Sequence, residues 1–148
     1  MKTVAKFGAC REHLWPYDVS KAGIEPPAEC YKDAKETRAL QYFRIAQDLR
    51  HLRACLADGY AFIFGMQAYL EGFATAQRTG KLPMPEGTGT LMGGHAVLAV
   101  GYDDKSQTVT ALNSLGKSWG DNGYFTMPYE FITNAELAYD FWTIRSIG

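Results

Sequence analysis

Apolar residues along the chain follow a helical period first and a strand-like pattern later. Between residues 45 and 56 they recur at spacings of four, three and four, which places them on one face of a helix: Ile45, Leu49, Leu52 and Leu56. Asp48 suits the start of this helix, where a carboxylate meets the positive end of the dipole, and Gly59 suits its end. Residues 38–45 and 60–64 are predicted to be strands.

Two segments rich in proline and glycine are predicted to be loops. Residues 15–27 contain three prolines, and residues 80–94 contain two prolines and five glycines. Helix is thus predicted mostly early in the chain and strand mostly late. This order favours an α+β domain with an antiparallel sheet, and we expect residues 1–148 to form a single domain.

A hairpin is predicted between His95 and Asn113. Residues 96–102 form its first strand, residues 103–106 its turn and residues 108–112 its second strand. A turn centred on residue 104 places His95 opposite Asn113, and opposed Cβ atoms lie about 4.5–5.5 Å apart. A centre displaced by half a residue pairs His95 with Ser114 instead.

An imidazole beside a carboxamide has a recognised chemical use. The amide oxygen accepts a hydrogen bond from one ring nitrogen and fixes the tautomer, so that the other nitrogen faces a nucleophile. The alternative is a histidine and an asparagine that merely cap a strand end. The pairing alone leaves both interpretations of His95 and Asn113 open.

Composition narrows the class of protein. The chain has 148 residues and a formal charge of -1, so it carries no excess of positive charge to attract nucleic acid or an anionic membrane. Its apolar runs, such as residues 96–100, are too short to cross a bilayer, and no signal peptide follows Met1. We expect a soluble protein, with its compartment left open.

Two motifs carry a resemblance to a known family. Residues 93–102 read Gly-Gly-His-Ala-Val-Leu-Ala-Val-Gly-Tyr, and residues 113–124 read Asn-Ser-Leu-Gly-Lys-Ser-Trp-Gly-Asp-Asn-Gly-Tyr. They resemble the catalytic-histidine strand and the asparagine motif of the papain-like cysteine peptidases, in the family's order and spacing. The wider resemblance runs from about residue 15 to residue 144. It implies a papain-like fold and a thiol-dependent peptidase that acts on peptide or protein substrates.

The resemblance assigns roles to several residues. It implies that His95 is the general base and that Asn113 orients it. Trp119 matches the second tryptophan of the asparagine motif, either an indole near the site or a core residue, and Ala96 is a candidate to line a side-chain pocket. Leu115 stands where the family has the first tryptophan, which covers the His–Asn hydrogen bond; leucine lacks the indole's area and π-face. The site is therefore either weakened or compensated by a neighbour.

No cysteine of the chain fits the nucleophile. A reactive thiolate is favoured at a helix N-terminus, and in the papain family it precedes the histidine by about 130–150 residues, whereas only 94 residues precede His95. Cys55 falls late in the predicted helix, Cys10 precedes a proline, and Cys30 follows a Pro-Pro loop. We expect the N-terminal segment that bears the cysteine to be absent. Cys10 and Cys30 are either buried thiols or a disulfide pair.

Three readings of function remain. The first is a papain-like peptidase chain that lacks its nucleophile segment, is inactive alone and has that missing segment as a partner. The second is a catalytically dead papain-like binding or inhibitory domain. The third is a smaller Cys–His hydrolase with Cys30 as nucleophile. No cofactor or metal site is expected, because His13 and His51 have no companion ligands at metal spacing.

Overall fold

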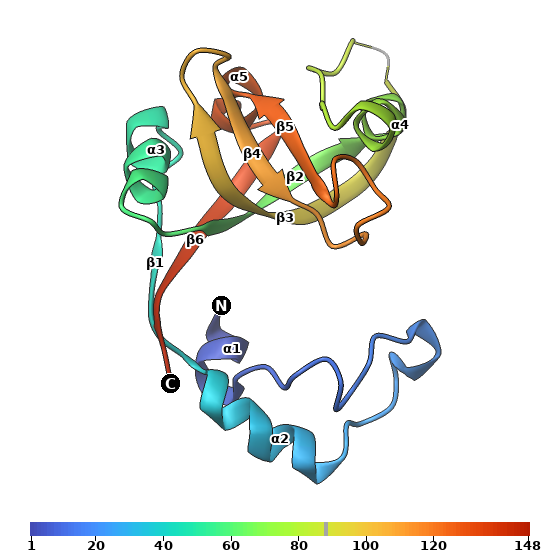
Figure 1. Ribbon diagram of the computed structural model, residues 1–148, viewed down its shortest axis with the longest axis vertical. Helices are drawn as coiled ribbons and strands as arrows, with labels where there is room; N and C mark the ends of the chain where they lie inside the picture. The colour runs from blue at the N-terminus through green and yellow to red at the C-terminus, as the bar shows by residue number, and fades with distance from the viewer. Residues whose placement is uncertain (88) are drawn as a thin grey trace. The chain divides into compact units, whose positions relative to one another are not determined.

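The computed structural model describes residues 1–87 and 89–148 and divides into two compact units (Figure 1). The first unit comprises residues 1–43 and 144–148, and the second comprises residues 44–143. Helices and loops make up most of the first unit. The second unit contains most of the sheet and both motifs, so it positions the candidate site.

The first unit consists of short helices, loops and the start of the sheet. Its elements are α1 (Lys2–Phe7), η1 (Val19–Lys21), α2 (Ala28–Ala34), η2 (Lys35–Thr37) and most of β1 (Ala39–Arg44). The segment after α1 lies against α2, because Arg11 Nε donates to Asp33 Oδ1 at 2.8 Å. Gly8 adopts a φ of 78°, and a Cβ there would lie 1.6 Å from the Ala34 carbonyl oxygen. Only glycine fits this close approach.

The second unit is built on an antiparallel sheet with helices beside it. Its elements are α3 (Leu49–Ala57), β2 (Phe62–Tyr69), α4 (Leu70–Thr79), β3 (Leu91–Asp103), β4 (Thr108–Leu112), β5 (Tyr124–Pro128), α5 (Tyr129–Thr133) and most of β6 (Ala138–Ile147). The strand order of the sheet is β1-β6-β2-β3-β4-β5. The pairs β2–β3, β3–β4, β4–β5 and β2–β6 are antiparallel. The predicted α+β class is confirmed.

The core of this unit lies on the face of the sheet defined by alternate residues of β2. Phe62, Phe64 and Met66 are fully buried, while the residues between them are more exposed, as the pleat of a strand requires. The Phe64 ring stacks on that of Phe141 in β6 at a centroid distance of 5.5 Å. This buried aromatic layer fixes which side chains of the neighbouring strand β3 turn inward.

The helix predicted from the apolar period is confirmed as α3. Asp48 caps its N-terminus, with Oδ1 accepting a hydrogen bond from Arg50 N at 2.9 Å. The side-chain hydrogen bond from Arg50 is also the main reason that the pKa of Asp48 is lowered. Leu52 is fully buried, and Gly59 follows the helix with a φ of 84°. Ile45 precedes the first helical residue, Leu49.

One prediction between residues 65 and 94 needs correction, and one helix was missed. No element was predicted for residues 65–79, which include α4. The loop was predicted to reach residue 94, but β3 begins at Leu91, so the connection is shorter; its residue Thr88 lies outside the described residues. The first residues of β3 pair with β2 across a bulge. Ala68 pairs with Gly93, but the next residue of β2, Tyr69, pairs with Leu91, so one residue of β3 is skipped.

The predicted register of the β3–β4 hairpin is wrong by two residues at the site. Near the turn Gly101 pairs with Thr110, whereas beyond a bulge Ala99 pairs with Ala111. The turn is displaced toward the C-terminus, because Asp103, the last residue of β3, pairs with Thr108. His95 is therefore not directly opposite Asn113 in the ladder.

A polar cluster joins α3, the β3–β4 turn and α5. Asp104 forms an ion pair with Arg53 and accepts a hydrogen bond from the Tyr129 hydroxyl at 2.8 Å. The Arg53 guanidinium lies over the Tyr102 ring, 5.3 Å from its centroid. Burial and then the hydrogen bond to Asp104 raise the pKa of Tyr129 from 10.0 to about 12. The protonated phenol is thus stabilised by folding.

We expect stability to depend on this phenol in alkali. Because folding raises the pKa of Tyr129, its contribution is complete below pH 10 and is lost as the pH rises from 10 to about 12. The parent should exceed Tyr129→Phe in unfolding free energy by about 1 kcal/mol at pH 7, and this gap should close above pH 10. Urea titrations across pH measure it, with Tyr17→Phe at an exposed tyrosine as control. A gap that is constant to pH 12 would contradict the assignment.

Candidate active site

The two side chains singled out from the sequence lie together. His95 Nε2 is 2.9 Å from Asn113 Oδ1. His95 is in β3, where its Cα partner on β2 is Met66, and Asn113 directly follows β4. The predicted hydrogen bond is therefore confirmed, although the register that predicted it is not.

The bulge in β3 explains why the contact survives the register error. Extending the Leu98–Leu112 pairing by one residue places Val97 opposite Asn113. His95 lies two residues from Val97 and so shares its face, as a diagonal neighbour of Asn113 within side-chain reach. Without the bulge the pairing would be displaced by one residue, and His95 and Asn113 would lie on opposite faces.

A backbone donor sets the direction of the His–Asn hydrogen bond. Ser114 N donates to Asn113 Oδ1 at 2.8 Å, and a backbone N–H can only donate. The oxygen, not the amide nitrogen, therefore occupies the position facing His95. His95 Nε2 must carry the proton and donate to it. In the neutral imidazole, Nδ1 is then the unprotonated nitrogen that can accept a proton.

The loop after Asn113 holds the carboxamide in place. Asn113 N donates to Gly123 O at 2.9 Å, and Gly123 N donates to Trp119 O at 2.8 Å. Asn113 is only 6% exposed, and its Nδ2 is buried without a hydrogen-bond partner among the described residues. These backbone hydrogen bonds and this burial hold the carboxamide with its oxygen toward His95.

Aromatic side chains surround the histidine on its inner side. The Phe73 ring of α4 lies 5.3 Å from the His95 ring, centroid to centroid, and nearly perpendicular to it at 82°. Phe73 also contacts Trp119 at 5.8 Å, and Trp119 contacts Phe125 at 5.3 Å. Trp119 is 6% exposed, so it is a core residue that reaches the site through Phe73. Sequence reasoning missed Phe73, because it did not identify its helix.

An open hollow of about 250 Å³ lies beside the histidine. Its lining comes from β2, α4, the start of β3 and the loop after β4: Ala68, Phe73, Met92, Gly93, Gly94, His95 and Leu115. Leu115 is 50% exposed and lines this hollow, so its position agrees with the predicted place at the site. The hollow is mostly apolar around one basic ring.

Ala96 lies on the other face of β3. It pairs with Gly65 of β2, and neighbouring residues of a strand point to opposite faces, so Ala96 points away from the side on which His95 lies. The Tyr139 ring covers this face closely, since a Cβ on Gly65 would lie 2.4 Å from it. Whether Ala96 lines a side-chain pocket stays a prediction.

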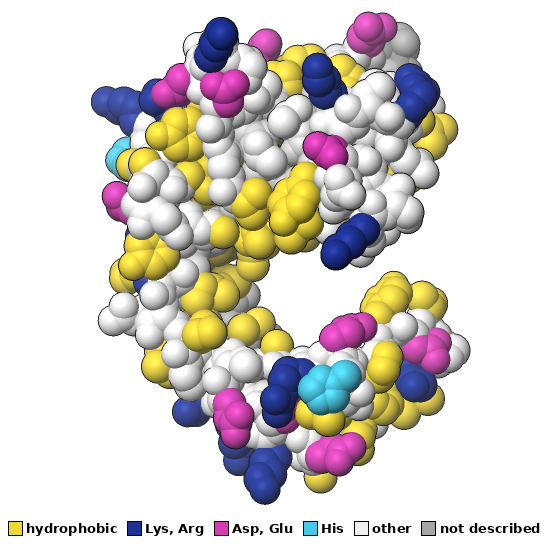
Figure 2. All heavy atoms as spheres, in the orientation of Figure 1, with side chains coloured by type: hydrophobic (Ala, Val, Ile, Leu, Met, Phe, Trp, Pro, Cys, Tyr) yellow, Lys and Arg dark blue, Asp and Glu magenta, His cyan; other side chains and the backbone are white. Residues whose placement is uncertain are grey.

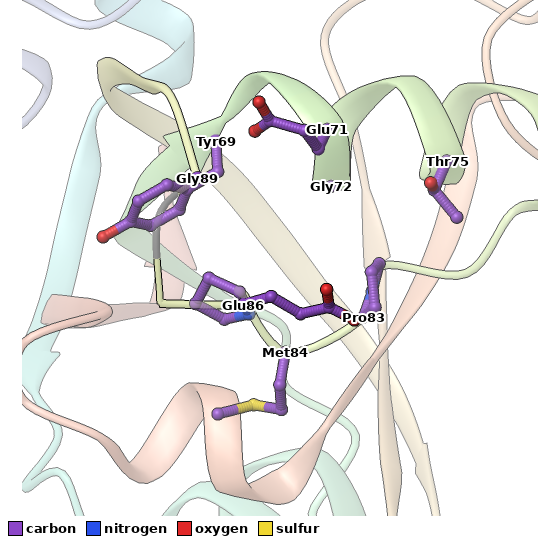
Figure 3. Close-up of a pocket in the computed structure, with 9 residues that line it drawn as sticks. Tyr69, Glu71, Gly72, Thr75, Pro83, Met84, Glu86 and Gly89 are labelled. Atoms are coloured by element: carbon purple, nitrogen blue, oxygen red, sulfur yellow. The ribbon is translucent and has the colours of Figure 1, made fainter.

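A separate pocket of about 340 Å³ lies between the start of α4 and the loop that follows this helix. Figure 3 shows Glu71 and Thr75 of α4 across from Met84 and Glu86 of the following loop. Glu71 Oε2 accepts a hydrogen bond from Thr90 N at 3.0 Å, and backbone hydrogen bonds lower the pKa of this carboxyl. The carboxylate thus anchors the loop, and none of the residues lining this pocket is one of the predicted site residues.

The structure describes the environment of the candidate thiols. Cys30, the third residue of α2, is 3% exposed, and burial and then a hydrogen bond to the Cys10 side chain raise its pKa. Cys55 is buried late in α3, with its thiol 3.4 Å from Tyr60 O. Within the described residues, none of the three thiols, Cys10 included, forms a disulfide. A raised pKa opposes the thiolate that a nucleophile requires.

Two further observations concern the described part of the chain. Among residues 1–87 and 89–148, no group of three or more His, Cys, Asp or Glu side chains could hold a metal ion. Within the same residues no helix is both long and apolar enough to cross a membrane.

The chain is thus an α+β protein with a His–Asn pair at the end of the β3–β4 hairpin. Comparison with known proteins identifies its family. A model described as papain family cysteine protease matches residues 1–141, and the chain belongs to this family. An uncharacterised peptidase C1-like protein of Acanthamoeba polyphaga mimivirus is 38% identical over 99% of this chain and 50% of its own length. The crystal structure of xylellain, a cysteine protease from Xylella fastidiosa, matches with a TM-score of 0.89 at 41% identity.

The extent of these matches is uneven. The xylellain match covers 99% of this chain and 60% of that one. Oryzain gamma chain from Oryza sativa subsp. japonica is 40% identical over 46% of this chain and 17% of its own length. The chain therefore spans about half the length of the mimivirus relative and a smaller part of the plant relative.

We predict that the loop after β4 is sensitive to a single methyl group. Gly120 has a φ of 61°, and a Cβ there would lie 2.5 Å from Tyr124 O, so Gly120→Ala meets both backbone strain and a steric clash. Unfolding free energy should fall by about 2 kcal/mol or more, as measured by denaturant titration. Gly23→Ala, where nothing lies within 4 Å of the new Cβ, is the matched control. An equal loss of unfolding free energy in Gly120→Ala and Gly23→Ala would contradict the requirement for glycine in this loop.

Proposed function

We propose that this chain supplies the general base and its orienting residue to a papain-like cysteine peptidase, whose substrates are peptides or proteins. In this reaction His95 Nδ1 removes the proton of a cysteine thiol, and the thiolate attacks the peptide carbonyl. His95 then returns the proton to the leaving amine. Asn113 holds the imidazole through Nε2 in both steps. Residues 1–148 belong in this proposal to one peptidase domain.

The observation that carries the proposal is the orientation of the His95 ring. Its Nε2 donates to Asn113 Oδ1, which itself is held by Ser114 N. Nδ1 is thereby left as the proton acceptor, which is the state a general base needs at neutral pH. A pair that merely capped a strand end would need none of these features.

We propose that the nucleophile comes from a segment outside residues 1–148. Family membership implies a cysteine, and the relatives are longer than this chain. Cys30 and Cys55 are poor candidates because both are buried, and the pKa of Cys30 is raised. Exposed apolar residues beside His95, such as Met92 and Leu115, offer a surface for such a segment. Figure 2 shows that hydrophobic side chains reach the surface between charges of both signs.

Two alternatives make different predictions. A catalytically dead binding domain is favoured by Leu115, which replaces the family's first tryptophan. A smaller Cys–His hydrolase requires Cys30 to become a thiolate, which its burial and raised pKa oppose. The dead domain should show no peptidase activity even when a polypeptide carrying the family's cysteine is added. The smaller hydrolase should be active without any added polypeptide.

The purified chain alone should not hydrolyse a fluorogenic dipeptide substrate. A general base without a thiol provides no covalent route. Turnover should return when a polypeptide carrying the cysteine helix of a family member is added, and an active-site-directed thiol reagent should abolish it. The same polypeptide with its cysteine replaced by alanine, and a His95→Gln chain, are the controls. Neither control should restore activity.

Other outcomes decide between the readings. Turnover by the chain alone that disappears in Cys30→Ala would establish the smaller hydrolase instead, and Cys10→Ala and Cys55→Ala serve as its controls. Binding of the cysteine-bearing polypeptide without any turnover would favour the dead domain.

We predict that Leu115→Trp preserves or raises the activity of the complemented enzyme. Leu115 is half exposed beside the hollow, so an indole has room and would reduce access of water to the His95–Asn113 bond. Leu115→Ala should lower kcat, since it removes the remaining apolar cover. Steady-state kinetics compare the two. Collapse of activity in Leu115→Trp would mean that leucine fills a space too small for indole.

A further inference from the structure

Among the described residues, His95 has a hydrogen bond to Asn113 and a ring contact with Phe73, and Phe73 lies outside the two motifs. Phe73 of α4 meets the imidazole nearly at right angles, with a centroid distance of 5.3 Å. A row of rings extends from it through Trp119 to Phe125 of β5. We name these four side chains, His95 included, the aromatic row.

A single hydrogen bond does not fix the plane of an imidazole. The bond from Nε2 to Asn113 sets the position of one ring atom, but the ring can still tilt about that atom. A perpendicular aromatic contact restricts this tilt, because edge-to-face geometry is preferred and adds attraction beyond buried area. Leu115 offers no ring for this purpose. Phe73 provides an aromatic contact on His95 where the chain has lost a tryptophan.

The helix that carries Phe73 is firmly anchored. Gly120 N donates to Gln77 O near the end of α4 at 3.1 Å, and Thr126 N of β5 donates to Gly80 O at 2.9 Å. Ala76, one turn after Phe73, is fully buried. The position of the Phe73 ring is therefore tied to the same loop and strand that seat Asn113 and Trp119. A fixed support of this kind can position a side chain, whereas a mobile one cannot.

We propose that Phe73 is a positioning residue that holds the imidazole plane of His95 so that Nδ1 points at the sulfur of the nucleophile. The effect on catalysis rests on the proposed function. The restraint on the His95 ring does not, because it is a property of the chain itself. Phe73 acts through His95 and has no role in binding the reacting atoms. Losing its ring should therefore affect the chemical step more than substrate binding.

The restraint is measurable on this chain without any nucleophile. The Nε2 proton exchanges with water only when the bond to Asn113 opens, so its exchange rate by NMR reports how firmly the ring is held. Phe73→Leu should exchange roughly 2- to 10-fold faster than the parent, in line with the strength of an aromatic pair. Phe73→Tyr keeps the ring and should stay near the parent rate. Phe131→Leu removes a buried ring of α5 outside the aromatic row and controls for general loss of packing.

Kinetics of the complemented enzyme supply the second readout. Phe73→Leu should lower kcat about tenfold or more with KM nearly unchanged, because the misplaced base acts only in the chemical step. Equal exchange rates in parent and Phe73→Leu would overturn the proposal, as would the same acceleration in Phe131→Leu. If even the parent shows no turnover, the proposed function fails, while the exchange rates still decide whether Phe73 holds the ring.

Discussion

The hydrogen bond from His95 Nε2 to Asn113 Oδ1, 2.9 Å long, is the interaction on which the account of this chain depends. Its direction follows from a neighbour that can only donate, Ser114 N, which binds the same oxygen. Once that oxygen faces the ring, the neutral histidine must expose an unprotonated Nδ1. A hydrogen bond with the opposite direction would leave a ring unable to take a proton from a thiol.

The surrounding structure maintains this bond through elements that are distant in sequence. The bulge in β3 brings His95 to the face on which Asn113 lies. The glycine-containing loop after β4 holds Asn113 through the bond from Asn113 N to Gly123 O, and the helix α4 places Phe73 against the imidazole. The bulge, the loop and the helix all restrict the position of one side chain, the imidazole of His95. Several supports on one side chain are typical of a preorganised site.

Much of this arrangement was predictable from the sequence, and the rest was not for physical reasons. The period of apolar residues identified α3, and two motifs identified His95 and Asn113. The register failed because the turn was centred on residue 104, whereas Asp103 pairs with Thr108. A bulge, which leaves no clear signal in a strand of alternating residues, then brought the error at the site to two residues and so preserved the face. Phe73 was missed because α4 begins without a side-chain cap and contains Gly72, so its local signal is weak. The contact between Phe73 and His95 joins residues far apart in the sequence, so only the packing of the folded chain determines it.

The central claim is tested most directly by the nitrogen chemical shifts of His95 in the chain at a pH where its ring is neutral. His13, which is exposed in the structure, provides a reference in the same spectrum. The account predicts that His95 Nε2 resonates as a protonated nitrogen and Nδ1 as an unprotonated one. The reverse assignment, or two nitrogens with averaged shifts like those of a free imidazole, would contradict it.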